Sequence, residues 1–232
     1  MLRALNQQGQ TVVAEACDVD ESPFFCPGCQ QQVLLKQGRI KIGHFAHLPA
    51  SDCAYALESE AHRGAKWEIY QSLQAESEVA DVRMEHSFSE VRADVSFLWK
   101  GQRVAIEVQA SHLASDVLEE RTLAYTRKNI AVLWTPLFRE EIWLGNRYAP
   151  RRWEKYIHGL YYGKVYYWEA GLKLQPVKFE EYRLAPNWYS TGQRSKQFVT
   201  PVLLSPCSLL DLAPIWRKEW RSYPRAKLWC GN

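Results

Sequence analysis

Two stretches decide the fold, Arg92-Ala93-Asp94-Val95-Ser96-Phe97-Leu98-Trp99 and Val104-Ala105-Ile106-Glu107-Val108-Gln109. Apolar residues take every second position in both, which predicts two half-buried strands. Lys100-Gly101-Gln102 between them is a turn, so the strands form a hairpin. The hairpin places Asp94 opposite Glu107 or Val108 and puts Gln109 on the same face. An acidic pair inside apolar strands is costly to bury without a cation, which favours a divalent metal site.

Helical periodicity flanks the hairpin on both sides. Glu58 to Leu73 and Asp116 to Lys128 carry apolar residues at helical spacing, and Ile130 to Trp134 is typical of a short buried strand. A further strand is expected within residues 82 to 109. The order is therefore helix, three strands, helix, strand, which predicts an α/β core with a mixed central sheet.

The first of these helices has a polar face. Glu58, His62 and Lys66 are spaced i, i+4 and i+8, so they line up along it. A solvated charge ladder is the alternative interpretation. Glu60 is the alternative to Glu58, since nothing in the sequence fixes which carboxylate points inward.

Metal-ligating residue types gather between residues 26 and 53. Cys26-Pro27-Gly28-Cys29 is a closely spaced pair on a turn, and a hairpin around Gly38, His44-Phe45-Ala46-His47 and Cys53 follow. We expect a structural zinc ion on Cys26, Cys29, His47 and Cys53, with His44 as the reserve ligand. The alternative is buried free cysteines with surface histidines.

Charge is distributed unevenly along the chain. The net charge is +3, but residues 1–135 hold 13 Lys and Arg against 18 Asp and Glu, whereas residues 136–232 hold 16 against 8. The later part also holds 7 of the 10 Trp residues. Basic residues among aromatics suit single-stranded or distorted nucleic acid, or else a packed domain with solvated cations. Trp216 to Arg221 are interpreted as a basic amphipathic helix, or else as an ordinary surface helix that packs two Trp residues.

Mean hydropathy is −0.38, and no apolar run approaches the ~20 residues of a membrane helix. The first residues lack an apolar core of signal-peptide length, so we expect a cytoplasmic protein that does not contact membranes.

The element order resembles the core of the PD-(D/E)XK, or restriction-endonuclease-like, nucleases, and the closer resemblance is to the competence protein CoiA family. The resemblance covers roughly residues 20 to 145 and is carried by these pieces: Cys26-Pro27-Gly28-Cys29, His44-Phe45-Ala46-His47, Glu58-Ser59, His62, Lys66, Arg92-Ala93-Asp94-Val95, Ile106-Glu107-Val108-Gln109-Ala110-Ser111, Arg121, Tyr125 and Leu133-Trp134.

The resemblance implies a Mg²⁺- or Mn²⁺-dependent deoxyribonuclease acting in DNA uptake, transformation or recombination. Asp94 and Glu107 would hold the ion, with Glu58 as a further ligand. Gln109 stands where the superfamily usually has lysine and supplies no positive charge; Lys66 on the facing helix would restore that charge if it reaches the site. His62 is interpreted as a proton shuttle, a second metal ligand or a polar core residue, and Ser111 as a phosphate contact or a turn cap. Arg121 and Tyr125 are expected to brace the fold.

The sequence thus predicts three parts: a zinc-ribbon-like module (1–56), a nuclease-like core (57–145) and a basic, aromatic-rich α+β extension (146–232). The expected partners are DNA, whether single-stranded, branched or duplex, and recombination proteins. Two other functions remain open. One is a non-catalytic nucleic-acid-binding recombination factor on a nuclease fold, and the other is a zinc-stabilised protein adaptor.

Overall fold

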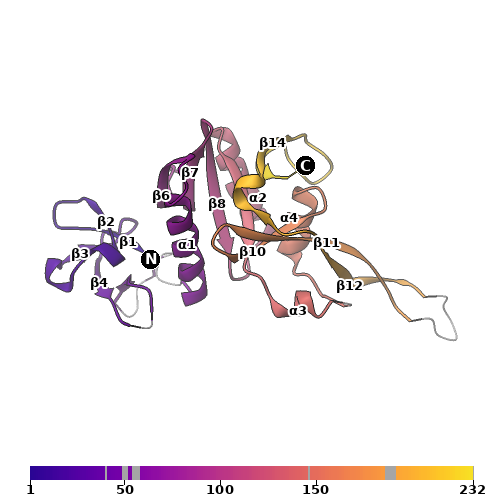
Figure 1. Ribbon diagram of the computed structural model, residues 1–232, viewed down its shortest axis with the longest axis horizontal. Helices are drawn as coiled ribbons and strands as arrows, with labels where there is room; N and C mark the ends of the chain where they lie inside the picture. Colours follow the sequence, from indigo (N-terminus) through magenta and orange to yellow (C-terminus); the bar gives the residue numbers. More distant parts are fainter. Residues whose placement is uncertain (40, 49–51, 54–57, 146, 186–191, 232) are drawn as a thin grey trace.

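The computed structural model describes the chain except for residues 40, 49–51, 54–57, 146, 186–191 and 232. Three β-sheets follow one another along an elongated molecule, with the N-terminal sheet at one end and the six-stranded central sheet in the middle (Figure 1). The expected boundary between residues 56 and 57 lies outside the described residues. Residue 146, where the expected extension begins, also lies outside the described residues.

The central sheet has the strand order β14-β15-β9-β8-β7-β6. Three consecutive strands form an antiparallel meander, and β9 then runs parallel to β8. Their bounds are β6 (Val79–Ser87), β7 (Arg92–Trp99), β8 (Gln102–Gln109) and β9 (Ala131–Pro136). Gly101 in the β7–β8 turn has φ +80°, the backbone conformation that tight hairpins require. The mixed sheet predicted from the alternating strands is confirmed.

Two helices pack on this sheet. α1 (Glu60–Gln74) precedes β6, and α2 (Ser115–Arg127) crosses from β8 to β9, so the predicted element order is confirmed. Helix α1 begins two residues later than expected, because Ser59 caps it by accepting the backbone N–H of His62. Its buried face is made by residues at helical spacing: Ala65, Ile69 and Leu73.

The N-terminal module has its own five-stranded sheet, in the order β2-β1-β3-β4-β5. Its strands are β1 (Arg3–Leu5), β2 (Thr11–Val13), β3 (Phe24–Phe25), β4 (Gln32–Lys36) and β5 (His44–His47), and two short 3₁₀ helices span Ala14–Ala16 and Val19–Glu21. β4 and β5 pair as a hairpin whose loop contains Gly38, but the second strand is His44–His47, whereas the hairpin was expected to end before His44. Phe24, Val33 and Phe45 belong to a small apolar core that is separate from the main one.

A third sheet follows the central core. Its elements and the helices before it are α3 (Glu140–Trp143), α4 (Arg152–Leu160), β10 (Val165–Ala170), β11 (Lys173–Arg183), β12 (Arg194–Leu203) and β13 (Cys207–Ser208), followed by a 3₁₀ helix at Leu209–Asp211. Strands β11 and β12 form a long hairpin that projects away from the body of the molecule (Figure 1).

The last two strands return to the central sheet. β15 (Ala226–Cys230) pairs in parallel with β9, and β14 (Ala213–Arg217) pairs with β15 at the sheet edge. The helix expected at Trp216 to Arg221 is wrong, because this segment begins in β14. A helix of so few residues is marginal by itself, whereas Trp216 and Arg217 pair with Lys227 and Ala226 of the fully buried β15.

Among the described residues, no helix has both the length and the apolar character needed to cross a membrane.

Candidate active site and a candidate zinc site

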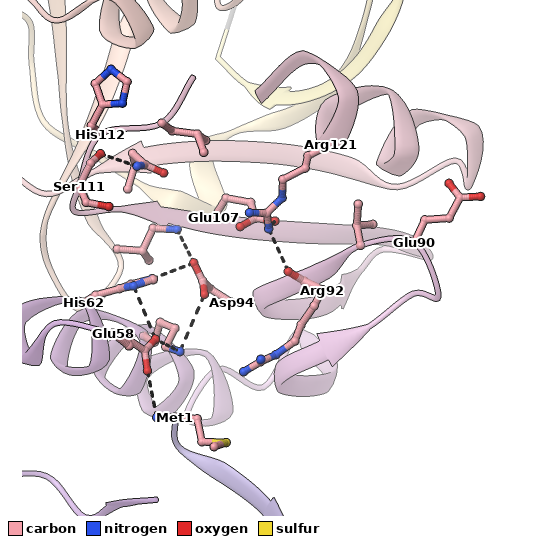
Figure 2. A pocket seen from close by; sticks show the side chains of 15 residues that line it. Met1, Glu58, His62, Glu90, Arg92, Asp94, Glu107, Ser111, His112 and Arg121 are labelled. Carbon is pink, nitrogen blue, oxygen red and sulfur yellow. Dashed lines mark hydrogen bonds and ion pairs between the residues drawn. The ribbon is translucent and has the colours of Figure 1, made fainter. Parts of the chain in front are cut away.

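A cavity of about 420 Å³ opens where α1 faces β7 and β8 (Figure 2). All the side chains predicted for the active site line it: Glu58, His62, Lys66, Asp94, Glu107, Gln109 and Ser111. Helix α1 and the segment before it supply three of them, and β7, β8 and the loop after β8 supply the rest. The fold therefore gathers into one place residues that lie up to about fifty positions apart in the chain.

Lys66 lies at the buried side of the cavity with only 1% of its side chain exposed. Its Nζ forms an ion pair with Glu58, lies 2.7 Å from Glu85 Oε1 and is 3.8 Å from Asp94 Oδ1. Burial opposes the charge of Lys66, but these carboxylates outweigh it and raise its pKa above the ordinary value. The positive charge of Lys66 is therefore neutralised by the carboxylates around it.

His62 bridges two carboxylates. Its Nε2 lies 3.0 Å from Asp94 Oδ2, and its Nδ1 lies 3.5 Å from Glu58 Oε1. Burial lowers the pKa of His62, yet the charge and hydrogen bond of Asp94, together with the charge of Glu58, outweigh it, and the net shift is upward. Glu60 instead forms an ion pair with Lys41 at the surface, so Glu58 is the carboxylate that faces the cavity.

Asp94 occupies the position in β7 that the hairpin predicted, on the cavity face and across from β8. Its Oδ2 accepts the backbone N–H of Val108 at 2.9 Å. Burial opposes ionisation of this carboxyl, but His62, Lys66 and the Val108 N–H together hold the pKa of Asp94 well below its usual range. Asp94 is therefore a carboxylate over the ordinary pH range.

Glu107 is held by two side chains of α2. Its Oε1 accepts a 2.6 Å hydrogen bond from Arg121 Nη2 and a second from the Tyr125 hydroxyl. Burial raises the pKa of Glu107 to about 7, against the opposing charge of Arg121. Arg121 also donates to the Arg92 carbonyl at 3.1 Å, so it ties α2 to the central sheet.

Gln109 and Ser111 lie where β8 ends. The side-chain amide of Gln109 donates a hydrogen bond to the Ser111 carbonyl, which closes this turn on itself. Ser111 is exposed at the cavity lining. The positive charge that Gln109 lacks is supplied elsewhere in the lining, by Arg92 and Arg121.

Glu85 was missed by the sequence analysis, although it organises the buried side of the site. It pairs with Lys66 and, at 2.7 Å, with Arg92, and it accepts the backbone N–H groups of Leu2 and Arg3. Burial opposes its ionisation, but the cations lower the pKa of Glu85 to about 2. Strand β6 carries a register shift, so its polar and apolar residues do not alternate in a way that marks Glu85 as buried.

Three of the cavity residues fit a cation. Glu58, His62 and Asp94 each offer a ligand atom, and these atoms lie within 4.8 Å of one another. Glu58 Oε2 is buried and accepts no hydrogen bond, although the Met1 amino group is 3.3 Å away. Oxygen and imidazole donors suit Mn²⁺, and the carboxylates suit Mg²⁺. Glu107 lies outside this group, so its role as a metal ligand stays a prediction.

A second cluster lies in the N-terminal module. The ligand atoms of Cys26, Cys29, His47 and Cys53 all lie within 4.8 Å of one another. The Sγ atoms of Cys26 and Cys53 are 3.9 Å apart, and Cys29 Sγ is 3.3 Å from His47 Nε2. Tetrahedral zinc with its usual bond lengths separates neighbouring ligand atoms by about 3.4–3.8 Å. The four residues therefore fit zinc, and His44 is not part of the group.

The fold and the cavity define a nuclease-like α/β domain, and residues 58–139 match the family model "Competence protein CoiA, nuclease-like domain". Residues 7–56 match the model "Competence protein CoiA, N-terminal domain". Together the two models cover more than half of the chain, which belongs to the competence protein CoiA family. The resemblance drawn from the motifs is confirmed.

A curated relative agrees with these matches. It is the competence protein CoiA of Bacillus subtilis (strain 168), 30% identical over 113 residues. The alignment covers 48% of this chain and 30% of the relative, so less than a third of the relative's length is matched. No solved structure matches the chain significantly.

Proposed function

We propose that the chain is a metal-dependent nuclease that hydrolyses phosphodiester bonds in DNA. The observation that carries the proposal is the convergence of Glu58, His62 and Asp94 in a cavity that Arg121 also lines. Donors for a cation beside a guanidinium for a phosphate are what phosphodiester hydrolysis requires. The family's nuclease-like domain supports the same reaction class.

In this proposal Asp94 and Glu58 hold Mg²⁺ or Mn²⁺, with Glu107 as the further predicted ligand. The bound ion supplies an activated water and stabilises charge on the phosphate. His62 either ligates the ion or carries a proton between water and Asp94, since its ring contacts that carboxylate. Gln109 and Ser111 orient the phosphate by hydrogen bonding.

The cation that meets the substrate is Arg121. Its side chain is 33% exposed, compared with 18% for Arg92 and 1% for Lys66. Lys66, which the sequence suggested as a substitute for the missing lysine, is committed to buried carboxylates. The element order, with Asp94 on the second strand and Glu107 on the third, supports a PD-(D/E)XK topology.

We also propose that Cys26, Cys29, His47 and Cys53 bind a structural zinc ion, which would replace a larger core in the N-terminal module. The role we propose is in DNA uptake or recombination, with recombination proteins, in the cytoplasm; the relative's name, a competence protein, supports the link to competence.

Cleavage of supercoiled, linear and single-stranded DNA with Mg²⁺ or Mn²⁺ tests the nuclease proposal. We expect Asp94→Asn to lower the rate at least about 100-fold, because it removes a ligand charge from the site. Asp81→Asn is the matched control, since Asp81 lies on the same sheet but pairs with Arg83 and Arg103 outside the cavity. A wild-type protein that cuts none of these substrates, or an Asp94→Asn variant that cuts as well as wild type, would contradict the proposal.

One observation favours a second function, a non-catalytic nucleic-acid-binding factor. Every cavity carboxylate already has a protein cation or imidazole beside it: Glu58 and Asp94 contact His62 and Lys66, and Glu107 contacts Arg121. These carboxylates thus have charge partners within the protein and do not need a metal ion for that purpose. If the protein binds DNA but cleaves none of the substrates above with either Mg²⁺ or Mn²⁺, the result would favour this second function.

A further inference from the structure

The ribbon formed by β14, β15 and their connection, residues 213–230, exposes large aromatic side chains. Trp216 is 44% exposed and Trp220 is 53% exposed. Tyr162, at the end of α4, is 53% exposed and joins the ribbon through Arg217. Among the described residues, these are three of the four exposed large aromatic side chains, the fourth being Trp143. Exposed rings are therefore concentrated here.

Cations of the ribbon lie over these rings. The Arg217 guanidinium is 4.7 Å from the ring centroid of Tyr162 and 4.8 Å from that of Tyr223. Arg221 lies 4.4 Å from Trp220, and Arg225 lies 4.9 Å from Trp216. Significant cation–π contacts occur about once per 70–80 residues in proteins. Their density within one short ribbon is far above that background.

The ribbon also carries positive charge without acidic partners. Residues 216–227 contain five cations and one acidic residue, Glu219; the cations are Arg217, Lys218, Arg221, Arg225 and Lys227. None of the five forms an ion pair within the described part of the chain. Lys218, Arg221 and Arg225 are exposed. A ligand for this surface must therefore be anionic.

Flat rings and unbalanced cations together specify the ligand. Single-stranded nucleic acid offers base faces that stack on aromatic rings and phosphates that attract cations, whereas a duplex hides its base faces inside the helix. Trp, Tyr and Arg are also common in protein interfaces, but the cores of those interfaces are depleted in charged residues, whereas this surface carries five cations against one acidic residue. The ribbon has the composition of a stacking platform.

We propose that the ribbon, together with Tyr162, binds single-stranded nucleic acid, with bases stacked on Tyr162, Trp216 and Trp220 and phosphates held by Lys218, Arg221 and Arg225. This rests on the proposed nucleic-acid substrate and names its form: a strand, or the unpaired part of a branched molecule, held at the edge of the central sheet.

The test is fluorescence anisotropy with a labelled oligothymidylate of about 15 nucleotides, within the usual site size of single-strand binders. The full chain carries Asp94→Asn and no Mg²⁺ or Mn²⁺ is added, so cleavage does not interfere. Trp216→Ala and Trp220→Ala are expected to weaken binding about tenfold each. Trp143→Ala is the matched control, because Trp143 is also 53% exposed but lies on α3, and it should bind as the parent does.

Two further variants separate stacking and charge from folding. Trp220→Phe keeps a stacking face and should retain most of the affinity, while circular dichroism confirms that each variant is folded. The salt dependence is the slope of the logarithm of the binding constant against the logarithm of the salt concentration. The double variant with Arg221→Gln and Arg225→Gln should reduce the magnitude of this slope by about 1.4, or roughly 0.7 per lost phosphate contact. A double variant with the parent's salt dependence would overturn the phosphate contacts.

Three results overturn the proposal. The first is that Trp216→Ala and Trp220→Ala bind the oligonucleotide as well as Trp143→Ala does, and the second is that they lose equal affinity for single-stranded and duplex probes. The third is a dimer that Trp216→Ala dissociates with no change in oligonucleotide binding. The last would make β14 a contact between two copies of the chain. Failure of the nuclease proposal is a separate result, since it shows as a wild-type protein that does not cut, whatever the ribbon variants bind.

Discussion

Lys66 Nζ lies 2.7 Å from Glu85 Oε1, and both side chains are almost completely buried. The pair joins α1 to β6. Glu85 also accepts the backbone N–H groups of Leu2 and Arg3, so a single carboxylate links the N-terminal module, the first helix and the central sheet.

We therefore expect Glu85→Gln to destabilise the protein by about 3–5 kcal/mol, because the buried Lys66 loses one of its carboxylate partners and Arg92 loses its ion pair with Glu85. The free energy of unfolding in urea measures this. Glu90→Gln is the control, since Glu90 pairs with Arg127 and both are 58% exposed; it should change stability by less than about 1 kcal/mol. Equal losses of unfolding free energy for the two variants would contradict a stabilising role of Glu85.

The same residue predicts an acid dependence of stability. Because the pKa of Glu85 is lowered to about 2 from an ordinary value of 4.5, the folded protein binds fewer protons than the unfolded chain between these values. The stabilisation is present above about pH 4.5 and is lost as the pH falls toward 2. Urea midpoints measured across this range should fall more steeply for wild type than for Glu85→Gln. Parallel curves would contradict the assignment.

Metal analysis checks the N-terminal site. Purified protein should contain about one zinc ion per chain, and Cys26→Ser should lose most of it, because a neutral hydroxyl replaces a thiolate ligand. Cys17→Ser is a control from the same module, since Cys17 lies outside the four-residue group. Folded wild-type protein without zinc, or equal zinc in both variants, would refute the site.

The cavity makes a separate prediction about Mn²⁺. His62→Gln should weaken Mn²⁺ binding at least about tenfold, because it removes an imidazole donor from the group of Glu58, His62 and Asp94. Electron paramagnetic resonance of free Mn²⁺ measures the affinity. His112 lines the same cavity outside that group, so His112→Gln should leave the affinity unchanged. A His62→Gln variant with full Mn²⁺ affinity would limit the role of His62 to proton transfer.

The sequence predicted those parts of the fold that depend on neighbouring residues. The alternation of apolar residues in β7 and β8, with Gly101 between them, predicted the hairpin. The spacing of Glu58, His62 and Lys66 predicted that these side chains lie on one face of α1 and of the segment that precedes it. These patterns are local, so they survive in the folded chain. The side chains they predicted do line one cavity.

The parts that depend on distant residues were not predictable in this way. Glu85 lies in an irregular strand, and its partners come from three other segments. The hold of Arg121 and Tyr125 on Glu107 depends on the packing of α2 against the sheet. Trp216 was assigned to a helix because its strand partner, Lys227, lies eleven positions later in the chain and leaves no local pattern.

The position of β15 has a consequence for how the protein is made. Strand β9, whose every residue is buried in the finished protein, ends at Pro136, and its outer neighbour begins only at Ala226, about 90 residues later. During synthesis on the ribosome, β9 therefore has no partner strand on one edge until β15 has been made. Open apolar edges of this kind recruit other strands, so the nascent chain passes through an interval in which it is prone to aggregate and to engage chaperones.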